Sequence, residues 1–183
     1  MKESYSPLWS KDSVRHIHNA SRVLRERVLT VQEAGSFATF PGYFTEREKL
    51  PSFLLIATVS GEGKLSYENH VYTLSPQTTC LIDCMQAHRY WAAVPWDFLW
   101  VHFTGPAAAD YARLAAVDPN PVAAIETAET LQEILAAAGT GTFEGDLTCN
   151  ELLTRVLTEI ILEKRKGGEE GGGLQDLDRK SVV

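Results

Sequence analysis

Short apolar and polar stretches alternate through the first half of the chain, and the period becomes helical after residue 105. Strands are predicted over 27–32, 36–40, 53–60, 63–68, 71–75, 79–84, 88–94 and 97–104, at intervals of about ten residues. Turn-forming residues separate them, among them Gly35, Pro41-Gly42, Gly61–Gly63 and Pro95. Short strands with such regular breaks predict an antiparallel barrel or sandwich.

The segment from Trp96 to Gly105 has the most informative alternation. One face of the predicted strand carries Phe98, Trp100 and His102, and the other carries Leu99, Val101 and Phe103. A strand exposed on one face would show polar residues there, and a strand buried on both faces is usually aliphatic. An aromatic row that ends in a hydrogen-bonding ring is typical of a ligand pocket. An aromatic core that binds nothing is the alternative.

Three helices are predicted after Gly105. The first begins at Pro106, and the second covers 127–138 and ends at Gly139. The third covers about 148–166, from a capping box at Thr148-x-x-Glu151 to the basic run before Gly167. Its broad apolar stripe consists of Leu152, Leu153, Val156, Leu157, Ile160 and Ile161. Part of this stripe is expected to remain exposed for a partner.

The two ends of the chain differ from the middle. Residues 1–26 are polar, contain Pro7 and show no clear period, so they read as an arm or a poorly ordered lead-in. Residues 167–183 begin with a Gly-Glu-rich run that predicts a flexible linker. The expected organisation is therefore an arm at 1–26, a barrel at 27–105, a helical region at 106–166 and a linker at 167–183.

Composition and charge narrow the function classes. With 183 residues and 44% hydrophobic content, the chain can form one core with an appended helical element. A net charge of −7 gives no excess of positive charge with which to bind the phosphate backbone of a nucleic acid. There is no apolar run of about 18 to 20 residues and no signal peptide, so no membrane partner and a cytoplasmic location are expected. Cys80, Cys84 and Cys149 are expected to be reduced, buried thiols.

The segments GEGKLSYENHVYTL, CLIDCMQAHRY and WDFLWVHFTG occur in the order seen in AraC-type transcription regulators. From about Arg27 to Gly105 the chain resembles the effector-binding domain of that family. The resemblance implies a mainly β fold with appended helices, a cupin-like jelly-roll barrel followed by an antiparallel helix pair. It also implies a homodimer formed through these helices, which could equally cover an open face of the barrel. DNA would be bound only by a C-terminal helix-turn-helix domain that this sequence lacks.

The same resemblance suggests which residues bind the effector. Arg47 matches an Arg that hydrogen-bonds effector hydroxyls in sugar-responsive members, although it could be a solvated loop residue. Tyr90 matches an effector-contacting Tyr, and Trp100 an aromatic residue on which a sugar ring packs. Phe98 replaces a His of a sugar-binding relative, so the pocket is less polar. The expected effector is a small molecule, a sugar or related polar metabolite, and the sugar is the less secure choice.

His88 and His102 complete the set of expected ligand-binding residues, with His88 also readable as a structural hydrogen-bonding residue at the barrel mouth. Metal-dependent cupins carry His-x-His after a Gly-rich turn, whereas Gly61-Glu62-Gly63 leads here into Lys64-Leu65-Ser66-Tyr67. No metal, cofactor or catalytic residue is therefore predicted. The sequence predicts the effector-sensing and dimerisation domain of an AraC-type regulator, and the alternative is a small cupin enzyme, an isomerase or metal-dependent dioxygenase.

Overall fold

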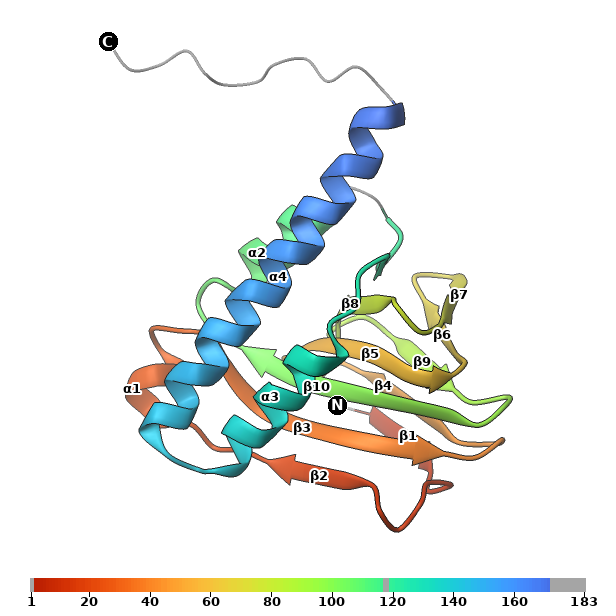
Figure 1. Ribbon diagram of the computed structural model, residues 1–183, viewed down its shortest axis with the longest axis horizontal. Coiled ribbons are helices and arrows are strands. Elements are labelled where there is room, and N and C mark those ends of the chain that lie inside the picture. Colours follow the sequence, from red (N-terminus) through yellow and green to blue (C-terminus); the bar gives the residue numbers. More distant parts are fainter. Residues whose placement is uncertain (1, 117–118, 172–183) are drawn as a thin grey trace.

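The computed structural model describes residues 2–116 and 119–171, whose strands form two antiparallel sheets (Figure 1). The five-stranded sheet has the order β1 (Lys2–Ser6), β4 (Phe44–Glu48), β9 (His88–Trp91), β6 (Gly63–Tyr67) and β7 (His70–Leu74). The six-stranded sheet has the order β11 (Val122–Ala123), β8 (Thr79–Asp83), β5 (Phe53–Gly61), β10 (Trp96–Thr104), β3 (Thr30–Thr39) and β2 (Val14–Ile17). The expected mainly β fold with appended helices is confirmed.

The six-stranded sheet separates two hydrophobic cores. Phe98 and Trp100 of β10 belong to the inner core, which lies between the two sheets. Leu99, Val101 and Phe103 belong to the outer core, on the face that the helices cover in Figure 1. The predicted alternation along β10 is therefore confirmed, because successive side chains of a strand point to opposite faces.

Gly35 does not break a strand, so the predicted separation of 27–32 from 36–40 is wrong. Strand β3 runs continuously through this glycine, which pairs with Trp100 of β10. A Cβ atom on Gly35 would lie 2.6 Å from Cε2 of Trp100. The glycine leaves space for the indole ring above the strand, a use of glycine that is common where a neighbouring group approaches closely.

The N-terminal segment is not poorly ordered, contrary to expectation. Strand β1 pairs with β4, and β2 pairs with β3, so each of these strands extends one sheet at its edge. Backbone hydrogen bonding at a sheet edge needs no apolar periodicity, so the sequence pattern does not reveal it. Trp9 between the two strands stacks on Phe37, with ring centroids 5.1 Å apart, and anchors the segment on the inner core. The short helix α1 (Arg22–Arg25) follows β2.

The helices follow the strands as predicted, with different ends. Helices α2 (Ala108–Ala115) and α3 (Ala128–Gly139) match their predicted ranges closely. Helix α4 (Phe143–Gly171) begins five residues before the predicted Thr148 and continues beyond Gly167. Among the described residues, no helix is long and apolar enough to cross a membrane.

Both ends of α4 have physical explanations. Thr142 Oγ1 accepts a hydrogen bond from Gly145 N at 3.1 Å, so Thr142 caps the helix, whereas Thr148 lies inside it and bonds back to Glu144 O. The prediction of a capping box at Thr148 is therefore wrong. Each glycine costs a helix only about 1 kcal/mol, so a long helix propagates through Gly167 and residues 167–171 are helical rather than part of a linker. Residues 172–183 lie outside the described part of the chain.

Helices α3 and α4 pack antiparallel, as expected. Cys149 Sγ donates to Ile134 O, and Arg155, further along α4, lies 3.6 Å from Glu133, earlier in α3. The apolar stripe of α4 packs into the outer core of this chain: Leu152, Leu153, Val156, Leu157 and Ile160 are buried and Ile161 is half-buried. The expectation that part of the stripe stays exposed is wrong, and a role for these six residues in dimerisation stays a prediction.

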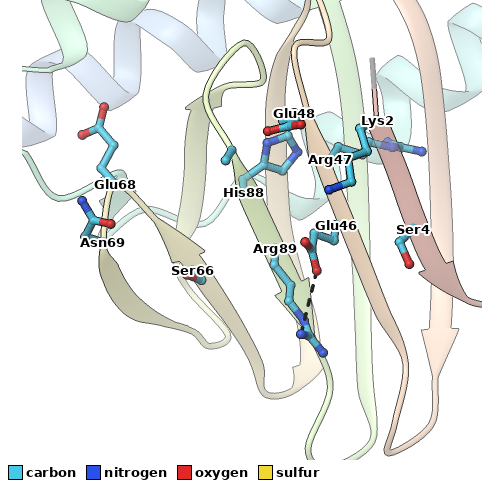
Figure 2. A pocket seen from close by; sticks show the side chains of 11 residues that line it. Lys2, Ser4, Glu46, Arg47, Glu48, Ser66, Glu68, Asn69, His88 and Arg89 are labelled. Carbon is cyan, nitrogen blue, oxygen red and sulfur yellow. Dashed lines mark ion pairs between the residues drawn. The ribbon is translucent and has the colours of Figure 1, made fainter.

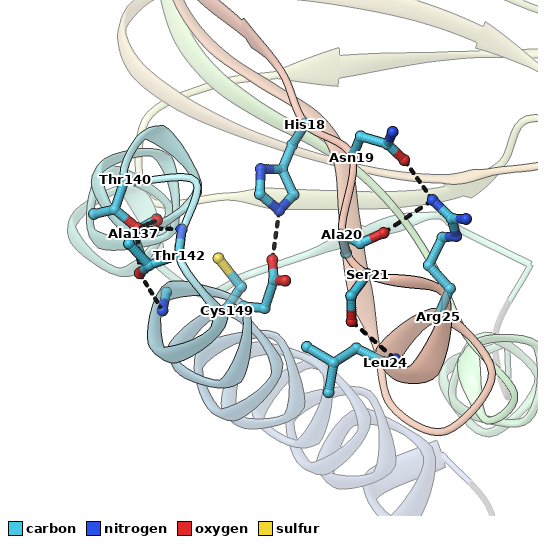
Figure 3. Close-up of polar contacts among 12 residues, drawn as sticks. His18, Asn19, Ala20, Ser21, Leu24, Arg25, Ala137, Thr140, Thr142 and Cys149 are labelled. Atoms are coloured by element: carbon cyan, nitrogen blue, oxygen red, sulfur yellow. Dashed lines mark hydrogen bonds and ion pairs between the residues drawn. The ribbon is translucent and has the colours of Figure 1, made fainter.

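A polar contact joins the N-terminal segment to α4. His18, which follows β2, hydrogen-bonds through Nε2 to a carboxylate oxygen of Asp146 in the first turn of α4 (Figure 3). Both side chains are only 8% exposed. A further bond, from the backbone N–H of Leu29 to Oδ1 of Asn150 at 3.1 Å, ties the start of the barrel to the same helix.

Replacing Asp146 with Ala is expected to lower the free energy of unfolding by about 1–3 kcal/mol, because it leaves the buried His18 ring without its partner. Asp110→Ala is the control, since this exposed carboxylate of α2 forms a surface ion pair with Arg113 at 3.1 Å and should change stability by less than about 0.5 kcal/mol. Urea denaturation monitored by circular dichroism measures both changes. Equal losses in the two variants would contradict a stabilising role for the His18–Asp146 contact.

Candidate ligand-binding site

A cavity of about 110 Å³ lies between the two sheets. Strands β1, β4 and β9 form one wall, and strands β2, β3 and β10 form the other. We call it the inner cavity; its lining consists of Glu3, Tyr5, Trp9, Arg15, Phe37, Tyr43, Thr45, Arg47, Tyr90 and Trp100. Aromatic rings make up most of this lining, and the charged groups stand at one side, as in pockets that bind small molecules.

Strand register explains why these residues meet. Arg47 of β4 lies opposite Glu3 of β1, and Thr45 lies opposite both Tyr5 of β1 and Tyr90 of β9. Because residues two apart on a strand share a face, Thr45 and Arg47 point inward together. No strand is predicted from the sequence between residues 40 and 53, whereas residues 44–48 form strand β4.

Three of the six predicted binding residues line the inner cavity: Arg47, Tyr90 and Trp100. Phe98 does not line it; this ring is 1% exposed and stacks on Trp96 with the ring centroids 3.8 Å apart. His102 lies behind Arg47, buried and hydrogen-bonded. The sixth residue, His88, lines a neighbouring groove that shares Arg47 with the cavity.

Arg47 and His102 form a hydrogen-bonded chain that fixes the protonation of the imidazole. Arg47 donates from a terminal nitrogen to Nε2 of His102 at 2.9 Å, so Nε2 must be unprotonated. Nδ1 then carries the proton and can donate to Oγ of Ser52, 3.1 Å away. Burial and the charge of Arg47 hold the pKa of His102 well below its ordinary value. His102 is therefore a neutral acceptor that orients Arg47.

His88 lies at the base of an open groove of about 320 Å³, which we call the outer groove (Figure 2). Its Nδ1 contacts Gln86 O at 2.9 Å, and its buried Nε2 has no hydrogen-bond partner among the described residues. Burial lowers the pKa of His88. The exposed wall of this groove carries charged side chains such as Glu46 and Arg89, which lie 3.9 Å apart. This groove lacks the aromatic lining of the inner cavity.

One of the residues that line the inner cavity, Trp100, carries an unused hydrogen-bond donor. Nε1 of Trp100 is buried and has no partner among the described residues, although such groups are nearly always paired in proteins. The hydroxyl groups of Tyr43 and Thr45 bond to each other at 3.0 Å. Burial raises the pKa of both Tyr43 and Tyr90, so these phenols stay neutral. The cavity is thus lined mainly by aromatic rings, together with Arg15, Arg47 and Glu3, and one of these rings, Trp100, carries an unpaired N–H group.

The sequence reading missed seven lining residues: Glu3, Tyr5, Trp9, Arg15, Phe37, Tyr43 and Thr45. Four of them belong to the N-terminal segment, which was expected to form an arm. Tyr5 and Trp9 were the available signal, because aromatic side chains are uncommon in segments that stay disordered.

The cysteine thiols are not activated as nucleophiles. The three cysteines are free and buried, as expected, and burial raises the pKa of Cys84 and of Cys149 to about 12. Their thiols are protonated at neutral pH and poorly nucleophilic. The described residues contain no cluster of three or more His, Cys, Asp or Glu side chains that could hold a metal ion.

Acid is expected to destabilise the fold through His102. In the unfolded chain this residue protonates near pH 6.5, whereas its pKa in the folded protein lies well below that value. The unfolded state therefore binds more protons below pH about 6.5, and stability falls there by up to about 1.4 kcal/mol per pH unit. Urea denaturation from pH about 7.5 to about 5 should show a shallower decline for His102→Gln than for the wild type.

His70→Gln, at an exposed histidine of β7, is the matched control and should keep the wild-type dependence on pH. If the wild type and His102→Gln declined in parallel, the buried neutral imidazole would not be the source of acid sensitivity.

The chain is similar to a known protein family and to several solved structures. A model of the AraC-like ligand binding domain matches residues 30–157. Similar solved structures include a cupin superfamily protein from Desulfitobacterium hafniense DCB-2 (12% identity, 51% of this chain and 79% of that chain, TM-score 0.40). Another is the cupin domain of an XRE family transcriptional regulator from Enterobacter cloacae (17% identity, 52% and 99%, TM-score 0.40).

A predicted oxalate decarboxylase from Thermotoga maritima is similar to the same extent (14% identity, 50% of this chain and 80% of that chain, TM-score 0.40). None of the curated proteins matches the chain. The family match covers well over half of the 183 residues, from β3 through the barrel and into α4. This chain belongs to the AraC-like ligand binding domain family.

Proposed function

We propose that this chain is the effector-sensing domain of an AraC-type transcription regulator and binds a small molecule in the inner cavity. One observation carries the proposal: Trp100, whose buried indole N–H has no partner among the described residues, lines the same aromatic cavity as Arg47. An empty donor of this kind costs stability unless a ligand or water satisfies it. The family match supports a binding role for this part of the chain.

The effector would act on DNA binding indirectly. The chain has a net charge of −7, so we infer that DNA is contacted by a C-terminal domain outside this sequence, in the cytoplasm. An effector in the inner cavity would touch Glu3 of β1 and Arg15 of β2, both in edge strands. Effector binding can shift the equilibrium between two arrangements only as far as its affinities for them differ.

Binding is a better account than catalysis. A cupin enzyme would need a free base, a nucleophile or a metal at the inner cavity, and His88, whose Nε2 has no partner among the described residues, does not line that cavity. Both ring nitrogens of His102 are engaged, by Arg47 and Ser52. The thiol of Cys84 is protonated. These contacts favour a cavity that holds a ligand over one that transforms it.

A ligand screen tests the proposed function. Thermal unfolding with sugars, polyols, aromatic acids and small amines should find at least one stabilising compound, since a ligand at a hundred times its Kd adds about 2.7 kcal/mol. Trp100→Phe should weaken that compound about tenfold or more, because the ring is kept and only the N–H donor and part of the ring surface are lost. Trp91→Phe is the matched control, at a half-buried position facing away from the cavity beside Arg89.

A compound that stabilised the wild type and Trp100→Phe equally would bind elsewhere, and the inner cavity would then not be the effector site. If no compound in the screen stabilised the wild type, the effector-sensing role would lose its support.

We also propose a homodimer that uses the exposed side of α4. With its apolar stripe buried, this helix still presents Leu147 and Leu162, which are 42% and 55% exposed. Leu162→Glu is expected to convert a dimer into a monomer in multi-angle light scattering, because it places a charge in an apolar contact. Glu159→Gln serves as the control on a neighbouring exposed position. A wild type that is already monomeric at about 100 μM would contradict the dimer.

A further inference from the structure

The charged groups at the inner cavity are arranged in two pairs. Arg47 contacts Glu3 of β1, with Nε 2.8 Å and a terminal nitrogen 2.6 Å from the carboxylate. Arg15 of β2 pairs with Glu33, which does not line the cavity. The Arg47 side chain is only 10% exposed, whereas that of Glu3 is 30% exposed. The carboxylate that neutralises the buried guanidinium thus comes from an edge strand.

The contact between Glu3 and Arg47 is incomplete. Both nitrogen atoms of Arg47 approach the same oxygen of Glu3, Oε1. The strongest pairing of a guanidinium with a carboxylate uses both oxygen atoms in parallel hydrogen bonds. Of the five N–H groups of Arg47, the contacts with Glu3 and His102 use three. Arg47 can therefore form a better pair with a second carboxylate than with Glu3.

Trp100 also lines the cavity and also needs a hydrogen-bond acceptor. Nε1 of Trp100 can only donate a hydrogen bond, and it is buried without an acceptor. A carboxylate near Arg47 has a second oxygen available for such a donor. Cationic ligands are disfavoured in spite of the aromatic lining, since Arg15 and Arg47 both face the cavity.

We propose that the ligand of the inner cavity is a small, flat monocarboxylic acid whose carboxylate takes the place of Glu3 on Arg47. This inference rests on the proposed function and specifies its ligand class. The ligand carboxylate accepts hydrogen bonds from Arg47 and Trp100, and its apolar body lies among Trp9, Phe37 and Tyr43. Because the ligand replaces Glu3, the buried guanidinium keeps one negative partner in both states.

Volume limits the size of the acid. The inner cavity measures about 110 Å³, while an engineered apolar cavity of about 150 Å³ holds benzene. A single ring with one carboxylate fits only if Glu3 gives up its space. Larger acids would require β1 to leave the sheet edge, which would cost its backbone hydrogen bonds with β4.

Benzoate and its neutral isostere benzamide are suitable probes for isothermal titration calorimetry with the 183-residue chain. We expect benzoate to bind wild type at least about tenfold more tightly than benzamide, because only benzoate supplies the charge for Arg47. Glu3→Gln removes the competing carboxylate, so benzoate should bind about fivefold to tenfold more tightly to this variant. The affinity for benzamide should stay within about twofold of its wild-type value.

Glu48→Gln is the matched control: it makes the same change on β4, whose residue 48 lies opposite Lys2 and outside the inner cavity. It should leave both affinities unchanged. Trp100→Phe should weaken benzoate, which places the binding in the inner cavity rather than in the outer groove.

Equal binding of benzoate and benzamide, or weaker benzoate binding in Glu3→Gln, would overturn the carboxylate proposal. Absence of benzoate binding to wild type and to Glu3→Gln at about 10 mM would also overturn it. Neither result decides the proposed function. A sugar, polyol or amine from the ligand screen that depended on Trp100 would preserve effector sensing while excluding an acid.

Discussion

The buried guanidinium of Arg47 is the constraint on which the site depends. A charge that is 10% exposed between two sheets must be neutralised and hydrogen-bonded, because an unpaired buried charge costs several kcal/mol. Glu3 supplies the negative charge, and His102 supplies a neutral acceptor. The ion pair with Glu3 holds β1 against β4. The hydrogen bond to His102 fixes the imidazole in one tautomer, and the charge of Arg47 lowers its pKa. One side chain thus determines the position of a strand and the protonation of a histidine.

The position of Trp100 depends on a second, steric constraint. Its ring lies over Gly35 of the neighbouring strand, where a methyl group would come within 2.6 Å. On the opposite face of β10, Leu99 and Val101 pack against the core under the helices. The strand therefore cannot shift by one residue without moving apolar side chains out of one core and the aromatic row out of the other. The cavity is as rigid as the two cores that surround β10.

Sequence analysis predicted the parts of the fold that apolar periodicity determines. The alternation of β10, the helical period after Gly105 and the antiparallel pairing of α3 with α4 were all readable, because each buries a regular set of side chains. Strands β1 and β2 were missed, since these edge strands are held by backbone hydrogen bonds rather than by a buried apolar face. Strand β4 lies inside its sheet, between β1 and β9, but its sequence FTERE has too few apolar residues to predict a strand.

The same contrast between apolar and polar strands explains which residues of the inner cavity could be predicted from the sequence. Trp100, Tyr90 and Arg47 were identified from the resemblance, and the geometry places all three at one cavity. Glu3 and Arg15 were missed because the strands that carry them were missed. The register of β1 and β2 places the cavity residues of the N-terminal segment. A single sequence indicates strand register only where one face of the strand is apolar, and these strands have no such face.

Strand β2 links the two halves of the molecule. Arg15 within β2 lines the inner cavity, and His18, three residues later, contacts Asp146 of α4 (Figure 3). A strand residue advances the chain by about 3.3 Å, so these two contacts lie only about 10 Å apart along the backbone. The His18–Asp146 contact is almost fully buried, so it cannot be exchanged for water without cost, whereas the Arg15 side chain is 52% exposed. The segment from Arg15 to His18 is therefore the shortest path along the backbone from the lining of the inner cavity to α4.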